Sequence, residues 1–263
     1  MGSPEAEAGR AGNESGHEVT IALAFEILRT EVTREAFEQR MGYAPGVVTP
    51  CNGRCPVQGV SWHEAAAYCN YLSAEAGLEY CYECRGSPPE ILCQSSAFFL
   101  APSSCPGYRL PTEAEWELAA RAGTATATYN GDLDASFLSC SPPSPTLDPI
   151  AWYCGNSSAG ALEAQVHPVA MLGPSASGLY DVLGNVGEWC HDACLGTPGG
   201  PCGDYPPEPA VDPSGPTPTW LGVVRGGSFS DPPPSVRAAA RAVSDSAESA
   251  AWVGFRPVRT LPR

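Results

Sequence analysis

Twelve cysteines set among turn-forming residues limit what this 263-residue chain can fold into. Gly and Pro number 28 each, about a fifth of the chain together, which is typical of a loop-rich fold. Residues 195–219, with eight prolines, are expected to form a surface loop. An even number of cysteines in such loops predicts a disulfide framework made in an oxidising compartment. Short loops favour the pairs Cys51 with Cys55 and Cys140 with Cys154, and the other pairings stay open.

A zinc site is the alternative use of these cysteines, because Cys81-Tyr-Glu-Cys84 has the spacing of a CxxC motif. A structural zinc site usually combines such a pair with a second pair or with closely spaced histidines. Here the next cysteines, Cys93 and Cys105, follow at irregular spacing, and the four histidines are scattered. Disulfides are therefore favoured over zinc.

The charge balance is strongly acidic, with 29 acidic against 14 basic residues and a formal net charge of −15. This excess repels phosphate, so nucleic acid and anionic membrane surfaces are not expected as partners. Hydrophobic residues make up 43% of the chain, enough for a sizeable core. No apolar run approaches the roughly 20 residues of a membrane-spanning helix, so no membrane span is expected in this chain.

Three short helices are predicted from their capping residues. Thr33 can cap the first, and Ser61 with Glu64 forms a capping box for the second. Thr112 with Glu115 forms another box, which begins the third. Strand-like pieces are expected between turns at Val19–Phe25, Ile150–Tyr153, Val223–Phe229 and Trp252–Arg256. Few helices among many irregular strands predict a compact α+β fold.

Four segments in a fixed order carry a family resemblance: Tyr108-Arg-Leu-Pro-Thr-Glu-Ala-Glu-Trp-Glu117, Gly178-Leu-Tyr-Asp-Val-Leu-Gly-Asn-Val-Gly-Glu-Trp189, Val224-Arg-Gly-Gly-Ser-Phe229 and Gly254-Phe-Arg256. Together they resemble the formylglycine-generating enzyme (sulfatase-modifying factor) family, whose fold is related to C-type lectins. Glu31-Val-Thr33 and Pro56-Val-Gln-Gly-Val-Ser-Trp62 fit earlier segments of that family. The resemblance implies a single domain over residues 1–263, with few short helices, irregular antiparallel strands and many loops.

The first residues of the chain resemble an internal stretch of the family that a strand normally precedes. Met1 is therefore expected to align inside the domain, and a first strand and an export signal or lipoprotein anchor are expected upstream of this chain. This hypothesis reconciles twelve cysteines with the lack of a visible signal peptide. It predicts an extracytoplasmic protein that is secreted, periplasmic or a lipoprotein.

The resemblance also implies a reaction, the oxidation of a cysteine in a sulfatase Cys-x-Pro-x-Arg motif to formylglycine. That reaction uses oxygen and a copper ion held by two cysteines shortly after the Gly-Gly-Ser segment, since soft thiolates suit Cu(I). Here the first cysteine position matches Asp231, the second falls within Pro232–Val236, and no cysteine follows Cys202. We therefore assign no catalytic residue and do not expect copper binding. The copper oxidase remains the alternative function.

A calcium site is implied by the segment that matches a calcium-binding loop of the family. By position, its ligands are the side chains of Asp181 and Glu188 and the backbone carbonyls of Gly184 and Val186. Carboxylate and carbonyl oxygens are the donors that Ca²⁺ prefers. The alternative is a Gly-rich turn in which Glu188 pairs with a core arginine.

Three arginines lie in the shared motifs: Arg109, Arg225 and Arg256. We interpret them as internal salt-bridge residues of the fold rather than as ligand contacts. Arg225 or Arg256 is the expected partner of Glu188 if that carboxylate does not bind calcium.

The leading hypothesis for function is a non-catalytic, disulfide-stapled binding domain. The segment Phe229–Val243 replaces the wall of the catalytic cleft and is expected to face the ligand. The candidate contacts are Phe229, Ser230, Asp231, Ser235 and Arg237. A peptide or protein ligand is expected first and a sugar second. In a variant of this hypothesis, the region between Gly-Gly-Ser and Gly-Phe-Arg is diversified by a retroelement, which requires a neighbouring reverse transcriptase gene and a near-repeat of the coding segment.

Overall fold

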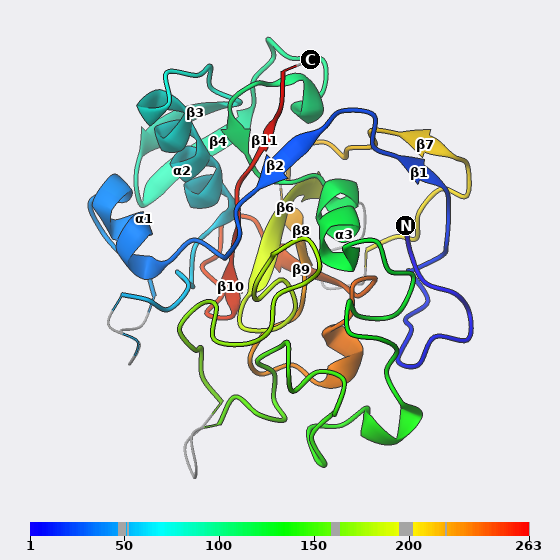
Figure 1. Ribbon diagram of the computed structural model, residues 1–263. Coiled ribbons are helices and arrows are strands. Elements are labelled where there is room, and N and C mark those ends of the chain that lie inside the picture. The colour runs from blue at the N-terminus through cyan, green and yellow to red at the C-terminus, as the bar shows by residue number, and fades with distance from the viewer. Residues whose placement is uncertain (47–50, 52, 159–163, 195–201, 219, 263) are drawn as a thin grey trace.

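The computed structural model of the chain describes residues 1–46, 51, 53–158, 164–194, 202–218 and 220–262. Within these ranges it has three short α-helices, short strands and long connecting loops, so the predicted α+β class is confirmed (Figure 1). Part of the predicted loop at 195–219 lies outside the described residues. No helix in the described ranges is long and apolar enough to cross a membrane.

The three predicted helices are confirmed as α1 (Arg34–Met41), α2 (Trp62–Glu75) and α3 (Glu113–Arg121). The Thr33 side chain accepts a hydrogen bond from the backbone of the first turn of α1. Ser61 and Glu64 form a complete capping box at α2, and Thr112 and Glu115 form one at α3. These bonds satisfy backbone N–H groups that a helix leaves free at its start.

The strands of the described chain form four small sheets, ordered β10-β6-β8-β9, β2-β11-β5, β3-β4 and β1-β7. Their bounds are β1 Val19–Thr20, β2 Phe25–Ile27, β3 Tyr82–Ser87, β4 Glu90–Ser95, β5 Tyr108–Arg109, β6 Gly187–Ala193, β7 Ala210–Val211, β8 Leu221–Arg225, β9 Arg241–Asp245, β10 Val253–Gly254 and β11 Val258–Thr260. Most pairs are antiparallel, as expected, but β1–β7 and β10–β6 are parallel. Short 3-10 helices occur at Pro102–Ser104 (η1), Ala135–Phe137 (η2) and Pro233–Ser235 (η3).

The prediction of a strand at Ile150–Tyr153 is wrong. The segment is mostly buried, which explains its strand-like composition, but most of its backbone hydrogen bonds are to residues nearby in the sequence. The Asn156 side chain accepts from the Tyr153 N–H at 3.0 Å and donates to the Ala151 carbonyl at 2.9 Å. An Asn side chain that binds nearby backbone in this way offers the chain an alternative to a sheet. The expected strand Val19–Phe25 is also divided, into β1 and the start of β2.

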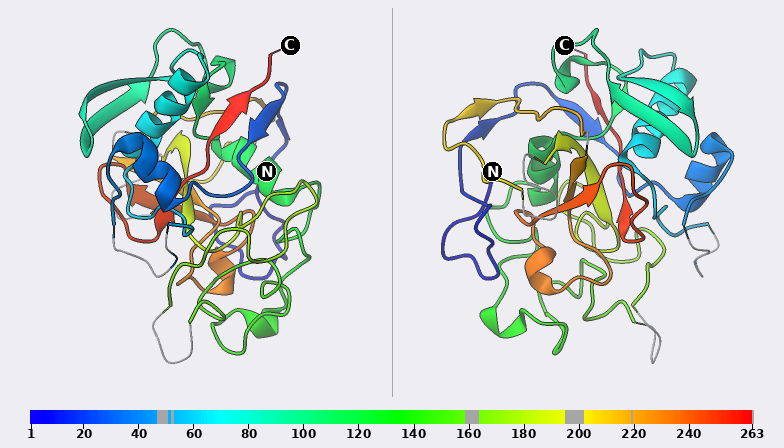
Figure 2. Two further views of the ribbon diagram at one scale, coloured as in Figure 1. Left: turned by 60° about the vertical axis from the view of Figure 1, so that its left-hand side comes forward. Right: turned by 180° about the vertical axis from the view of Figure 1, so that it is seen from behind.

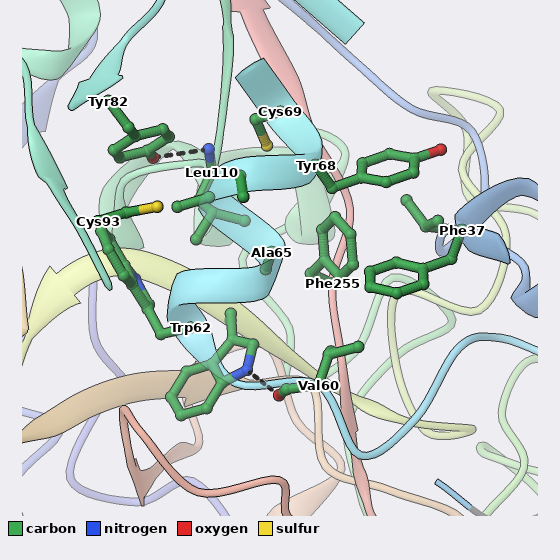
Figure 3. Packing of buried hydrophobic residues seen from close by; sticks show 14 of the residues in the cluster. Phe37, Val60, Trp62, Ala65, Tyr68, Cys69, Tyr82, Cys93, Leu110 and Phe255 are labelled. Atoms are coloured by element: carbon green, nitrogen blue, oxygen red, sulfur yellow. Dashed lines mark hydrogen bonds between the residues drawn. The ribbon is translucent and has the colours of Figure 1, made fainter. Parts of the chain in front are cut away.

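Two large hydrophobic clusters support the fold. In one, α2 packs against the β3–β4 hairpin on one side of the molecule (Figures 1 and 2). Figure 3 shows its centre, where the stacked rings of Phe37 and Tyr68 lie next to Phe255. In the other, Trp116 of α3 packs with residues of the loops between α3 and β6 and with residues of β6 and β8. The central β6-β8-β9 sheet contributes Trp189 and Val224 to the first cluster and Cys190 and Val223 to the second.

All twelve cysteines lie in the described residues, and ten of them form disulfides. The predicted pairs Cys51–Cys55 and Cys140–Cys154 are confirmed. The other pairs are Cys81–Cys105, Cys84–Cys93 and Cys194–Cys202. Both cysteines of the CxxC motif are therefore in disulfides. Cys69 and Cys190 are free thiols buried in the protein.

Candidate ligand-binding cleft

A cleft of 570 Å³ lies over the segment that joins β8 to β10. Most of its lining comes from η3, β9 and the turns next to them, between Gly227 and Trp252. The N-terminal segment supplies Gly9, Ala11 and Glu14 to the lining. Residues more than 200 positions apart in the sequence therefore meet in one cleft, which we call the β8–β10 cleft.

A tight turn after β8 shapes the inner wall of this cleft. Gly227 has a φ of 69°, and a Cβ there would lie 2.6 Å from the backbone oxygen of Ser235. Glycine is therefore required both by the left-handed conformation and by the close approach of η3. The Asp231 carboxylate closes the turn, because its Oδ2 accepts from the N–H of Ser228 at 2.8 Å and from its hydroxyl at 2.7 Å.

Arg237 holds the N-terminal segment against the cleft. Its guanidinium is 1% exposed and donates to the carboxylates of Glu7 and Glu14 and to the backbone oxygens of Gly9 and Pro234. Hydrogen bonds between ionised groups are about twice as strong as neutral ones, and they are directional. Arg237 therefore builds the cleft wall, and its guanidinium is already committed to protein acceptors.

The structure brings four of the five predicted ligand contacts together in the cleft lining: Ser230, Asp231, Ser235 and Arg237. Phe229 is placed elsewhere, in a small cluster with Cys55, Val166 and Val186. Its side chain is half-buried there, and its backbone N–H and carbonyl bind Asn185 and Ser157. Phe229 anchors the turn rather than lining the cleft.

Sequence reasoning missed two parts of the cleft. Trp252 lines it from just before the Gly254-Phe255-Arg256 motif, and that position next to a shared motif was an available signal. The wall from Gly9 to Glu14 carried no comparable signal. It depends on ion pairs with Arg237 that span more than 220 residues.

Thiols in the described chain do not form the cysteine pair that a copper oxidase of this kind requires. Asp231 accepts a backbone hydrogen bond from Cys154 at 3.1 Å, but Cys154 is in a disulfide with Cys140. The free thiols of Cys69 and Cys190 lie in different hydrophobic clusters. Burial, more than any other cause, raises the pKa of both thiols. They therefore stay protonated, whereas copper ligation requires thiolates.

Both carboxylates of the predicted calcium site are engaged by donors of the protein. The Glu188 carboxylate accepts from Arg256 at 2.6–2.8 Å and from the indole Nε1 of Trp116 at 2.7 Å. The Oδ2 of Asp181 accepts from the backbone N–H of Ala170 at 2.6 Å. Burial raises the pKa of Asp181. Within the described ranges, no group of three or more His, Cys, Asp or Glu residues is arranged to hold a metal ion. The calcium site stays a prediction, without support from side-chain geometry.

The structure places Arg109, Arg225 and Arg256 in buried ion pairs, as predicted. Arg109 binds Glu115 in a two-pronged pair at 2.6 and 2.7 Å. Arg256 pairs with Glu188. Arg256 is one of the two arginines that were expected as partners of this carboxylate.

Arg225 joins two carboxylates of α3. It binds Glu113 at 2.9 Å and Glu117 at 2.6 Å, and its guanidinium lies 5.2 Å from the Trp116 ring centroid. Arg241 of β9 binds Glu113 as well, at 2.7 Å. This network connects α3 to the sheet that carries the β8–β10 cleft.

The family described as "Sulfatase-modifying factor enzyme 1-like domain" matches residues 1–261, so the chain belongs to this family. The resemblance inferred from the four motifs is confirmed.

Three similar proteins carry names that denote different functions. The chain is 29% identical over 187 residues to the chaperone protein LppX of Paenibacillus barcinonensis, covering 64% of this chain and 62% of that protein. It is 34% identical over 166 residues to a formylglycine-generating enzyme of Thermomonospora curvata, covering 57% and 48%. It is 35% identical over 128 residues to the Streptomyces coelicolor enzyme, covering 47% and 36%. The matched region thus spans less than two thirds of each relative.

Similar solved structures confirm the fold over nearly the whole chain. Treponema denticola variable protein 1 superposes with a TM-score of 0.74 at 27% identity, covering 99% of this chain and 94% of that one. PvdO from Pseudomonas aeruginosa superposes with a TM-score of 0.70 at 24% identity, covering 99% and 90%. The second likeness shows the fold alone.

Proposed function

We propose that this protein is a non-catalytic, extracytoplasmic binding domain that takes its ligand in the β8–β10 cleft. The proposal rests on the residues found at the position where the resemblance places the copper site. There, Asp231 closes a turn and the nearby Cys154 is in a disulfide, while a 570 Å³ cleft opens beside them.

The lining supports a peptide as the first ligand and a sugar as the second. Trp252 and Val243 give apolar and aromatic surface, and Ser230 and Ser235 give hydroxyl groups. The charges of Arg237 and Arg241 are offset by glutamates, so among the described residues that line it the cleft presents no unpaired cation to an anionic ligand. A site of mixed apolar and hydroxyl character suits uncharged polar ligands.

An extracytoplasmic location is supported by the five disulfides, which persist in oxidising compartments. The names of two similar proteins support a binding role. One relative is a chaperone protein, and one similar structure is a variable protein. The second name fits the hypothesis that the segment between Gly-Gly-Ser and Gly-Phe-Arg, which supplies most of the cleft lining, is diversified between copies.

Copper-loaded protein incubated in air with a Cys-x-Pro-x-Arg peptide is expected to give no aldehyde product by mass spectrometry. The reason is that no pair of accessible thiolates exists at the site in the described chain. A copper-dependent family enzyme that converts the same peptide alongside is the control. Turnover by this protein would favour the copper oxidase instead.

Selection from a displayed random peptide library is expected to give binders that require the β8–β10 cleft. Trp252→Ala should weaken a selected peptide at least tenfold, since one buried aromatic anchor often carries more than 1.4 kcal/mol of binding free energy. Trp220→Ala is the matched control, because Trp220 is 72% exposed and does not line the cleft. Equal losses in both variants, or no binders at all, would count against the cleft as the peptide site.

A further inference from the structure

A second cavity, of 260 Å³, lies beside the ends of β3 and β4. Its other walls come from the loop 96–105 and from residues 214–217, and it shares no lining residue with the β8–β10 cleft. We call it the hairpin pocket. The Cys81–Cys105 disulfide lines it and fixes one wall. Asp192 fixes another, since it accepts from the Gly215 N–H at 2.5 Å.

A chain of hydrogen bonds runs through the residues that line this pocket. The Leu110 N–H donates to the Tyr82 hydroxyl at 3.0 Å (Figure 3). The same hydroxyl lies 3.3 Å from Nδ1 of His191, whose Nε2 lies 3.2 Å from the Ser95 hydroxyl. Tyr82, His191 and Ser95 all line the pocket.

The backbone amide sets the direction of this chain. Because the Leu110 N–H can only donate, the Tyr82 oxygen accepts there, and its own hydrogen goes to Nδ1 of His191. Burial and the Arg109 charge lower the pKa of His191 to about 3, so its ring is neutral. The ring hydrogen then sits on Nε2 and is donated to Ser95. Within the described residues, the hydroxyl hydrogen of Ser95 is left without an acceptor.

Arg109 also belongs to the pocket wall, but its guanidinium is committed to the protein. Both Nη atoms bind Glu115, and the side chain is fully buried, so Arg109 offers no donor to a ligand. Ser95 is half-buried, so its hydroxyl hydrogen can be donated to a ligand in the pocket, and the partner of that donor is an acceptor.

The local charges decide which acceptor fits. Glu115 already neutralises Arg109, and His191 is uncharged. A carboxylate ligand would place a second negative charge near Glu115 with no cation of its own. A neutral carbonyl oxygen accepts the same hydrogen bonds without that repulsion.

The remaining walls combine apolar side chains with hydroxyl-bearing residues. Phe99, Leu100, Pro102 and Pro216 line the pocket, and Leu100 is fully exposed. Phe98, next to it, is 81% exposed. The volume of 260 Å³ lies just below the range of about 300–1,000 Å³ for drug-sized ligands. A single apolar residue of a peptide is of suitable size.

We propose that the hairpin pocket binds one apolar residue of a peptide, with the Ser95 hydroxyl donating to a neutral backbone carbonyl and with Phe99 and Leu100 packing on the side chain. The Ser95 hydroxyl hydrogen without an acceptor in the described chain and the partly apolar lining carry this inference. It concerns a site separate from the β8–β10 cleft, so either site can fail without the other.

The test titrates the folded protein with N-acetyl-leucine amide and follows ligand-observed saturation-transfer NMR. We expect saturable binding that Ser95→Ala weakens about five- to tenfold, which corresponds to one lost hydrogen bond. Ser230→Ala, which removes a hydroxyl from the other cleft, is the matched control and should leave the affinity unchanged. N-acetyl-leucine, which carries a free carboxylate, should bind more weakly than the amide.

Each outcome decides the proposal. A melting temperature of Ser95→Ala equal to that of the parent shows that the variant is folded, and Ser95→Thr, which keeps the hydroxyl, provides a second comparison. Loss of affinity in Ser95→Ala together with binding by Ser95→Thr supports the site. Absence of binding by the amide, equal affinity in Ser95→Ala and the parent protein, or tighter binding of the carboxylate each overturns it.

Discussion

Replacing Arg256 by methionine is expected to lower the free energy of unfolding by about 3–5 kcal/mol, the usual cost of removing one partner of a buried ion pair. Arg256 is fully buried and makes three short contacts with the Glu188 carboxylate. It also donates to the backbone oxygens of Leu28 and Tyr180. Methionine fills much of the volume but leaves the Glu188 charge in the core.

Surrounding acids make this loss severe. Burial, with the charges of Asp181 and Glu188, raises the pKa of Glu31 well above its usual value. This part of the core therefore already disfavours negative charge. Without Arg256, the Glu188 carboxylate keeps a hydrogen bond from one side-chain donor of the described chain, the indole of Trp116. Glu188 would then have to become protonated or the region would open.

The measurement is urea denaturation with the disulfides intact, and two further variants serve as comparisons. Arg259→Met removes an arginine three residues away whose partner, Glu26, is 47% exposed, and it should change stability by less than about 1 kcal/mol. The double variant Arg256→Met with Glu188→Gln should recover part of the loss, because it removes the stranded charge. An Arg256→Met protein as stable as the parent would contradict the assignment of Arg256 to a structural ion pair.

Local signals in the sequence predicted the local structure well. Thr33, Ser61 and Thr112 each begin a helix where expected, because an N-cap bond involves residues three positions apart and can be read from a short window. The disulfides Cys51–Cys55 and Cys140–Cys154, with sequence separations of 4 and 14, were predicted for a similar reason. The other three pairs were not predicted: Cys194–Cys202, Cys81–Cys105 and Cys84–Cys93. The last two depend on the β3–β4 hairpin and the loop after it.

Long-range contacts explain what the sequence did not show. Arg237 was predicted to contact a ligand, but its partners Glu7 and Glu14 lie more than 220 residues away. Glu188 has the residue type and position of a calcium ligand, and only its packing against Arg256 shows that its oxygens are engaged. The hairpin pocket combines four separate segments, so no single motif could indicate it.

Two neighbouring residues of β6 have opposite pKa shifts whose effects on the pH dependence of stability cancel. Burial, then the charge of Arg109, lowers the pKa of His191 from 6.5 to about 3. Burial, then the charge of Glu113, raises the pKa of Asp192 from 3.8 to about 7. Between about pH 4 and 6.5 the unfolded chain carries a proton on His191, and the folded chain carries one on Asp192. The number of bound protons is equal, so the pair adds no pH dependence there.

Removing one member should reveal the other. In His191→Gln, the raised pKa of Asp192 remains, so stability relative to the parent should fall as the pH rises from about 4 to 7. In Asp192→Asn, the lowered pKa of His191 remains, so relative stability should be lost as the pH falls from 6.5 towards 3. Each slope approaches about 1.4 kcal/mol per pH unit, the value for one proton.

Urea denaturation of the parent and both single variants at pH 4, 5, 6 and 7 tests this cancellation. Over that range the two single variants should diverge in opposite directions, each by about 3 kcal/mol relative to the parent. The double variant should run parallel to the parent, because it binds the same number of protons folded and unfolded at these positions. Single variants whose stabilities run parallel to the parent at every pH would show that His191 and Asp192 are not held neutral in the folded protein. The neutral ring that orients Ser95 in the hairpin pocket would then be excluded as well, so this measurement also tests the basis of that site.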